Sequence, residues 1–330
     1  MQRSLKVALI GIGNMGSNHL RVLSMMKSVE LVFVYDSNSR VVAEVTEMYG
    51  VKGATDLLED LKLVDAVIIA TPTFTHFELL QLVSNYVNYI FVEKPLTDSL
   101  ETTKVIEKIA KEKGVYVQVG FIERFNPVIR EIQKILKSSD RVINIDFTRT
   151  NRLSNRIKDV DVIIDLMIHD IDLAIFLNGK VRDVFAYGTI EGNMIAYSSA
   201  ILMHENGVYS RLTASRVTEK RIRQVSVTCS DMYVDCDLTK KELSINKQTF
   251  EQSYHYISLS SVEENVYVTP QEPLLSELMS FVEYCLRGKQ DNIIPDIKAA
   301  KEAILIASEI QYQIKRRSSQ KGICFDAVMV

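Results

Sequence analysis

The chain has 330 residues, of which 47% are hydrophobic and 25% are charged, and its formal net charge is -3. This length favours two domains, and this composition is typical of a folded soluble protein rather than a disordered one. A net negative charge gives no basic surface for a phosphate backbone, so we expect no nucleic-acid partner. The N-terminal apolar run Val7–Ile10 stops at Gly11, far short of the roughly 18 residues that span a membrane, so we expect no membrane insertion.

The cysteines form no C-x-x-C pair and no spacing typical of metal ligands. They are Cys229, Cys236, Cys285 and Cys324. Such scattered residues predict reduced thiols, which persist in a reducing compartment. We therefore expect a cytoplasmic protein without a bound metal.

The first part of the chain alternates between short apolar runs and helical patterns. The apolar runs cover residues 6–10, 31–35, 66–70, 89–92 and 115–119. Continuously apolar strands separated by helices are typical of a parallel sheet with both faces covered. We therefore predict an α/β Rossmann domain, a doubly wound parallel sheet, over residues 1–122.

A glycine motif follows the first apolar run and precedes a helical pattern. Its six residues are Gly11, Ile12, Gly13, Asn14, Met15 and Gly16. A G-x-G-x-x-G sequence in this context binds dinucleotides. The first glycine permits a tight turn, the second lets the pyrophosphate approach the backbone, and the third lets the helix pack on the strand. The N–H groups at the start of the helix then receive the phosphate charge.

An acidic residue, Asp36, ends the second apolar run, 20 residues beyond Gly16. Its carboxylate is placed to accept hydrogen bonds from the adenosine ribose hydroxyls and to repel a 2'-phosphate. This favours NAD as the cofactor. Arg40 lies just beyond and could bind a 2'-phosphate, so NADP stays open.

Beyond about residue 140 the pattern becomes rich in strands. Runs over residues 142–150, 183–189, 197–203, 208–215 and 225–237 indicate an open, mostly antiparallel sheet. Helical patterns over residues 274–286 and 297–314 follow. We predict that residues 123–330 form an α+β domain for substrate binding and oligomerisation that includes these C-terminal helices.

Two short motifs lie where apolar strands of the first domain end. Thr71 and Pro72 follow one strand, and Glu93, Lys94 and Pro95 end the next. Ligands of doubly wound folds bind at this carboxyl edge of the sheet, so Lys94 can meet a cofactor there.

A third motif, Asp165 and His169, lies in the second domain. On an α-helix residues four apart share a face, which would let the carboxylate orient the imidazole. A structural pair is the alternative interpretation, and the dinucleotide motif and Lys94 favour the catalytic one.

Together these motifs resemble the Gfo/Idh/MocA family of NAD(P)-dependent oxidoreductases over essentially the whole chain. The resemblance implies that the reacting carbon is lined by Lys94, Asp165 and His169. It also implies a cofactor site that includes Thr71, Pro72, His76, Glu93 and Lys94, with His76 beside the nicotinamide ribose. Where many members have glycines around the aspartate, this chain has bulkier residues at Ile163, Ile164 and Met167.

The residue types fit the removal of hydride from a secondary alcohol. The hydroxyl proton must also leave, and His169 has an ordinary pKa of about 6.5, suited to accepting it near neutrality. Lys94 would stabilise charge on the oxygen, and Asp165 would hold the imidazole. Which of Lys94 and His169 takes the proton is left open.

Residues 120–127 and 165–172 are most similar to family members that act on nucleotide-linked amino sugars, the UDP-N-acetylglucosamine 3-dehydrogenases. A nucleotide sugar brings a diphosphate, which an arginine fork can bind. The candidates for substrate contact are Arg124, Asn126, Arg149 and Arg152, with Arg156 close by.

Two other functions remain open. A free sugar, an inositol or another cyclic polyol could replace the nucleotide sugar. In a different class, the protein could be an NAD(H)-binding regulator without turnover. In either case we expect a homodimer or homotetramer, formed through the second domain.

Overall fold

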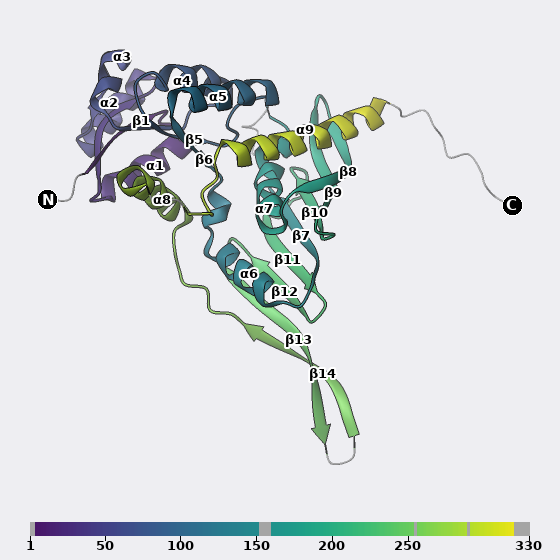
Figure 1. Ribbon diagram of the computed structural model, residues 1–330. Helices are drawn as coiled ribbons and strands as arrows, with labels where there is room; N and C mark the ends of the chain where they lie inside the picture. The colour runs from purple at the N-terminus through teal and green to yellow at the C-terminus, as the bar shows by residue number, and fades with distance from the viewer. Residues whose placement is uncertain (1–3, 152–159, 254–255, 289–290, 320–330) are drawn as a thin grey trace. The chain divides into compact units, whose positions relative to one another are not determined.

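A computed structural model describes residues 4–151, 160–253, 256–288 and 291–319. The chain forms two compact units (Figure 1). The first consists of Met1–Asn126 and Gln271–Ile304, and the second of Pro127–Pro270 and Leu305–Val330.

The first unit contains a six-stranded sheet in the order β3-β2-β1-β4-β5-β6. Every neighbouring pair runs parallel. The strands are β1 (Leu5–Ile10), β2 (Val29–Tyr35), β3 (Lys52–Gly53), β4 (Ala66–Ile69), β5 (Tyr89–Glu93) and β6 (Tyr116–Gly120). The order reverses beside β1, which has β2 on one side and β4 on the other. The predicted doubly wound Rossmann domain is confirmed, and its ligand crevice is expected at this switch point.

Helices connect the strands, and their ends follow local sequence signals. They are α1 (Asn14–Met25), α2 (Ser39–Tyr49), α3 (Leu57–Asp60), α4 (His76–Val83) and α5 (Leu100–Lys113), with 3-10 turns η1 (Leu61–Leu63), η2 (Thr73–Thr75) and η3 (Ile122–Phe125). Asn38 caps α2 and Ser99 caps α5 through side-chain oxygens. Gly50 and Gly114 end the same two helices in the left-handed conformation, which glycine adopts without strain.

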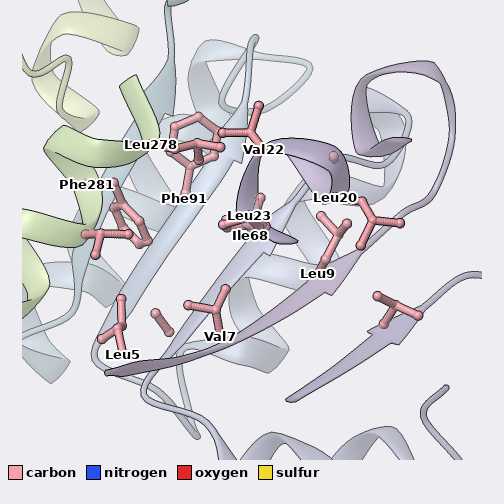
Figure 2. Packing of buried hydrophobic residues seen from close by; sticks show 14 of the residues in the cluster. Leu5, Val7, Leu9, Leu20, Val22, Leu23, Ile68, Phe91, Leu278 and Phe281 are labelled. Atoms are coloured by element: carbon pink, nitrogen blue, oxygen red, sulfur yellow. The ribbon is translucent and has the colours of Figure 1, made fainter. Parts of the chain in front are cut away.

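A late helix, α8 (Pro273–Arg287), completes the first core. Figure 2 shows Leu278 and Phe281 of α8 beside Phe91 of β5 and Val22 of α1, all buried. The Phe91 and Phe281 rings meet edge to face at 5.8 Å. The apolar face of α8 therefore belongs to the first unit. The division expected from the sequence places both late helices in the second domain, residues 123–330.

The second unit contains an eight-stranded sheet in the order β14-β13-β12-β11-β7-β10-β9-β8. The strands are β7 (Val142–Thr150), β8 (Val181–Glu191), β9 (Met194–His204), β10 (Tyr209–Ser215), β11 (Ile222–Cys229), β12 (Met232–Asp237), β13 (Glu242–Ser253) and β14 (Tyr256–Asn265). All pairs are antiparallel except β7 with β10. The predicted open, mostly antiparallel sheet is confirmed.

Helices α6 (Pro127–Ser138) and α7 (Ile168–Asn178) belong to this unit, as does α9 (Ile297–Ser319) from Leu305 onward. Side chains of α9 pair with the edge strand β8. Gln313 accepts from the Ala186 N–H at 2.9 Å and donates to the Val184 carbonyl at 2.8 Å. Arg317 donates to the Ala186 carbonyl. These bonds occupy backbone groups that would otherwise be open to another strand.

A buried polar network joins β9 to the end of α7. His204 Nδ1 lies 2.8 Å from the Gly179 carbonyl and Nε2 lies 2.8 Å from Ser210 Oγ. Asn178 donates to the same Ser210 oxygen at 3.0 Å. A neutral imidazole satisfies both contacts, donating at Nδ1 and accepting at Nε2. Burial lowers the pKa of His204 below its ordinary value.

This lowered pKa predicts a loss of stability in mild acid. The unfolded chain takes up a proton near pH 6.5 that the folded protein resists, so the free energy of unfolding falls as pH drops below about 6.5. One such histidine contributes at most about 1.4 kcal/mol per pH unit. Urea unfolding at pH 7.5 and 5.5 should show a smaller difference for His204→Gln than for the wild type. An equal difference would contradict this assignment.

Candidate active site

The three glycines of the motif have different surroundings. Gly11 has φ +94, and a Cβ there would lie 2.7 Å from the backbone of Ala70. At Gly16 a Cβ would lie 2.0 Å from the Gly11 carbonyl oxygen. At Gly13 it would meet nothing within 4 Å. Gly11 and Gly16 therefore serve close packing, and Gly13 faces space.

That space adjoins the N-terminus of α1. Gly13 is the N-cap residue, and no side chain caps the helix. The first N–H groups of the helix are thus available, with the positive end of the helix dipole, for an anion. The arrangement fits the pyrophosphate of a dinucleotide.

Asp36 lies directly after β2 and reaches the glycine loop. Its Oδ2 accepts from the Ile12 N–H at 2.7 Å, and its Oδ1 accepts from the Asn38 N–H at 2.9 Å. Arg40 pairs with Glu44 at 3.2 Å, and its side chain is 87% exposed. An exposed pair of this kind contributes little stability, so it does not fix Arg40 in place.

We expect Asp36→Asn to weaken NADH binding about tenfold, because a hydrogen bond to a charged group is worth roughly 1.5 kcal/mol or more. Discrimination against NADPH should fall as well, since the repelling charge is gone. Fluorescence titration with both cofactors measures the two effects. Arg40→Ala is the matched control and should leave NADH binding unchanged. Equal NADH affinity in Asp36→Asn and the wild type would refute this role.

His76, the first residue of α4, joins the loops that follow β4 and β5. Its side chain is fully buried. Nε2 lies 2.9 Å from the Thr71 carbonyl and Nδ1 lies 2.9 Å from the Pro95 carbonyl. Burial lowers the pKa of His76. The contact with the nicotinamide ribose stays a prediction.

Glu93, at the end of β5, is held from two sides. Its Oε1 lies 2.8 Å from Nε2 of the buried His19 on α1, and its Oε2 accepts from the Lys94 N–H at 3.2 Å. Lys94 and Pro95 are joined by a cis peptide bond. The backbone of the predicted catalytic lysine is thus tied to the helix that begins at the glycine motif. Nothing in the sequence around His19 indicates this pairing with Glu93 across 74 positions.

Arg124 and Asn126 belong to the turn after β6. Both are buried, with 5% and 4% of their surface exposed. Asn126 Nδ2 donates to Glu123 Oε2 at 3.3 Å. The contact of Arg124 and Asn126 with substrate stays a prediction.

The Asp165–His169 motif does not form the regular α-helix that its spacing suggested. Residues Ile163–Met167 form a π-helical turn, η4, and α7 begins after it. Asp165 lies inside the π turn and His169 in the first turn of α7, so the simple four-residue periodicity does not describe their relative placement. Single π turns occur often at functional sites. Ile163 and Met167, two of the bulky residues that stand where many family members have glycines, are buried, so their side chains lie in the core.

Two arginines hold this segment. Arg149 on β7 makes contacts of 2.7–3.0 Å with the Asp170 carboxylate, and both side chains are only 4% exposed. Arg216, directly after β10, donates to Asp165 Oδ2 at 3.0 Å. Arg216 was not predicted from the sequence, where no motif surrounds it. Arg152 and Arg156 lie outside the described residues.

The candidate residues thus form two groups. In the first unit the glycine loop, Asp36, His76, Glu93 and Lys94 gather around the carboxyl ends of β1, β2, β4 and β5. In the second unit Asp165, His169 and Arg149 gather around η4 and α7. Among the described residues, no group of three or more His, Cys, Asp and Glu side chains could hold a metal ion, and none of the helices is long and apolar enough to cross a membrane.

Two family models match the chain. The model described as oxidoreductase family, NAD-binding Rossmann fold, matches residues 5–121, and the GFO/IDH/MocA C-terminal domain matches residues 139–234. The chain belongs to the Gfo/Idh/MocA family. The predicted family, its oxidoreductase class and its NAD-binding Rossmann domain are confirmed.

Individual relatives cover much of the chain. UDP-N-acetylglucosamine 3-dehydrogenase of Acidithiobacillus ferrooxidans is 30% identical over 246 residues, which are 73% of this chain and 76% of that protein. The scyllo-inositol 2-dehydrogenase (NAD(+)) of Bacillus subtilis is 32% identical over 205 residues, 58% of this chain and 60% of its own. The solved structure of the Acidithiobacillus enzyme, GnnA, superposes with a TM-score of 0.84 at 26% identity, covering 95% of this chain and 98% of that one.

Proposed function

We propose that the protein is an NAD-dependent dehydrogenase of a nucleotide-linked amino sugar, with the C3 hydroxyl of UDP-N-acetylglucosamine as its first candidate substrate. The observation that carries the proposal is the similarity to the Acidithiobacillus enzyme, which extends over 73% of the chain in sequence and 95% in structure. A free sugar, inositol or cyclic polyol is the second candidate, favoured by the similarity to the scyllo-inositol enzyme.

The roles of the chain's own residues follow from their chemistry. NAD, when bound, accepts a hydride from the alcohol carbon. His169 takes the hydroxyl proton, because an imidazole is a base at neutral pH. Lys94 donates a hydrogen bond to the oxygen as charge develops on it. The loop that carries Lys94 is supported by Glu93 and His76.

Substrate contacts are proposed for Arg124 and Asn126, which directly follow the last strand of the Rossmann sheet. Arg149 and Arg152 complete the proposed set for a diphosphate. Arg149 already binds Asp170 through two of its nitrogens, which is a structural role. A contact with the substrate diphosphate would be a second role of the same side chain.

We also propose a homodimer or homotetramer in the cytoplasm. Phe185 and Tyr187 of β8 and Ile201 of β9 are large apolar residues exposed on the sheet, and Phe185 pairs directly with Ile201. Such exposed apolar surface suits a second copy of the chain. Light scattering of the purified protein should give a dimer or tetramer mass, and a monomer mass would refute self-association.

The deciding experiment mixes purified protein with NAD and a panel of UDP-sugars, free sugars and inositols. NADH absorbance reports turnover, and thermal shift reports binding. Turnover of UDP-N-acetylglucosamine, with heat protection by UDP alone, is the expected result, because a ligand of the native state stabilises it. Turnover of inositols without protection by UDP would support the second candidate. NADH binding without turnover of any compound would support the regulatory alternative.

A further inference from the structure

The segment that carries the proposed base is held from the ends of two neighbouring strands. β7 and β10 run parallel, with Arg149 paired in register with Ala214. Their carboxyl ends therefore lie at the same edge of the sheet. Arg149 is the penultimate residue of β7, and Arg216 directly follows β10. Each arginine reaches a different carboxylate of the segment.

Arg216 makes two contacts with the π turn and its approach. Nη2 donates to Asp165 Oδ2 at 3.0 Å, and Nη1 donates to the Val160 carbonyl. The Arg216 side chain is 4% exposed, and the Asp165 side chain is 25% exposed. The Arg216 backbone is itself fixed, since its N–H donates to the Ala196 carbonyl of β9 at 2.9 Å. One rigid guanidinium thus fixes both the chain before the turn and the carboxylate within it.

The start of the turn is fixed independently by Asp161. Its Oδ1 accepts from the N–H groups of Ile163 and Ile164 at 3.0 and 3.1 Å, and its Oδ2 accepts from Gln311 Nε2 at 2.6 Å. The backbone of η4 therefore does not depend on Arg216 alone. Removal of Arg216 should therefore abolish its bond to the Asp165 carboxylate without unfolding the turn.

We propose that Arg216 is a positioning residue for the dehydrogenase reaction, holding the Asp165 carboxylate in the arrangement in which His169 accepts the substrate proton. The inference rests on the proposed function, because it takes His169 as the base. Arg216 also neutralises the charge of Asp165, which precedes that base by four residues in the chain. An uncompensated carboxylate favours imidazolium, which cannot accept a proton.

The consequence for His169 can be measured without a substrate. The charged side chains of this segment are Asp161, Asp165, Asp170 and Asp172, and those of β7, of β10 and of the residue after β10 are Asp146, Arg149, Arg211 and Arg216. Arg216→Met removes one positive charge and keeps much of the side-chain volume. It should raise the titration midpoint of His169 by about half a pH unit. Asp165→Asn should lower the midpoint, and Arg216→Lys should leave it nearly unchanged.

Histidine-labelled full-length protein gives this titration by NMR, with the His169 signal assigned as the one missing from His169→Gln. The chain has only five histidines, so assignment is direct. An equal midpoint in Arg216→Met and the wild type would overturn the proposal. Thermal melting of each variant, compared with the wild type, shows whether it is folded. If Arg216→Met does not fold, Arg216→Lys still tests the positioning role through turnover.

Turnover of UDP-N-acetylglucosamine separates geometry from charge. Arg216→Lys keeps the charge but lacks the fork that reaches both Asp165 and Val160. We expect kcat to fall about tenfold, with KM and the NADH Kd unchanged, and to fall further in Arg216→Met. Unchanged kcat in Arg216→Lys and Arg216→Met would overturn the proposal. If the wild type turns over none of the UDP-sugars, free sugars and inositols, the proposed function fails. The His169 titration then still decides whether Arg216 affects the charge of the His169 imidazole.

Discussion

Replacing His169 by alanine should lower kcat for UDP-N-acetylglucosamine by about 10²- to 10⁴-fold, the usual contribution of a positioned general base. The hydroxyl proton then has no acceptor on η4 or α7 of comparable basicity, since the other titratable side chains of those two elements are carboxyl groups. NADH absorbance at saturating substrate and cofactor measures the effect. NADH affinity should be unchanged, because the glycine loop and Asp36 belong to the other unit.

The comparison with Lys94→Ala assigns the base. If His169 takes the proton, the wild-type profile of kcat/KM against pH should fall on the acid side near the His169 pKa. Lys94→Ala should turn over slowly but still show this fall of kcat/KM at acid pH. His169→Ala should turn over slowly and no longer show it. The reverse pattern would make Lys94 the base. Wild-type turnover in both variants would remove both residues from the mechanism.

Much of the first unit follows from the sequence because its signals are local. The four residues of β4 are all apolar and all fully buried, as the strand of a doubly covered sheet requires. The glycine motif adds a turn whose geometry only glycine accepts at Gly11. Strand, turn and helix can therefore be placed from neighbouring residues alone.

The contacts that support the candidate site are not local. His19 and Glu93 are 74 positions apart, and Asp165 and Arg216 are 51 apart. Nothing in the sequence distinguishes Arg216 from a solvated arginine. The packing of α8 on the first sheet also depends on a chain that returns after the second sheet. Such pairings arise from tertiary topology, which periodicity does not encode.

The second unit shows where periodicity misleads. The run over residues 225–237 is two strands, β11 and β12, joined at Ser230 and Asp231. Strands β13 and β14 are rich in Ser, Gln, Asn and Glu, and they carry no clean alternation of apolar residues. At the motif itself, the π turn adds a residue to the helical repeat, so a four-residue spacing no longer means a shared face.

Two glycine substitutions separate folding from cofactor binding. In Gly16→Ala the new Cβ would lie 2.0 Å from the Gly11 carbonyl oxygen, which belongs to backbone and cannot rotate away. We expect the free energy of unfolding to fall by about 3 kcal/mol or more. Gly13→Ala meets nothing within 4 Å, and its φ of -70 suits an L residue, so stability should change by less than about 0.5 kcal/mol.

Gly13→Ala should nevertheless weaken NADH binding about 10- to 100-fold, because a methyl group there occupies the space where phosphate would accept from the N–H groups of α1. Urea unfolding and fluorescence titration of the two variants give the comparison. Normal NADH affinity in Gly13→Ala would place the pyrophosphate elsewhere, since a ligand that used this helix terminus could not avoid the added methyl. Full stability in Gly16→Ala would mean that the loop backbone can move away from α1, and the glycine motif would then not need its tight packing to fold.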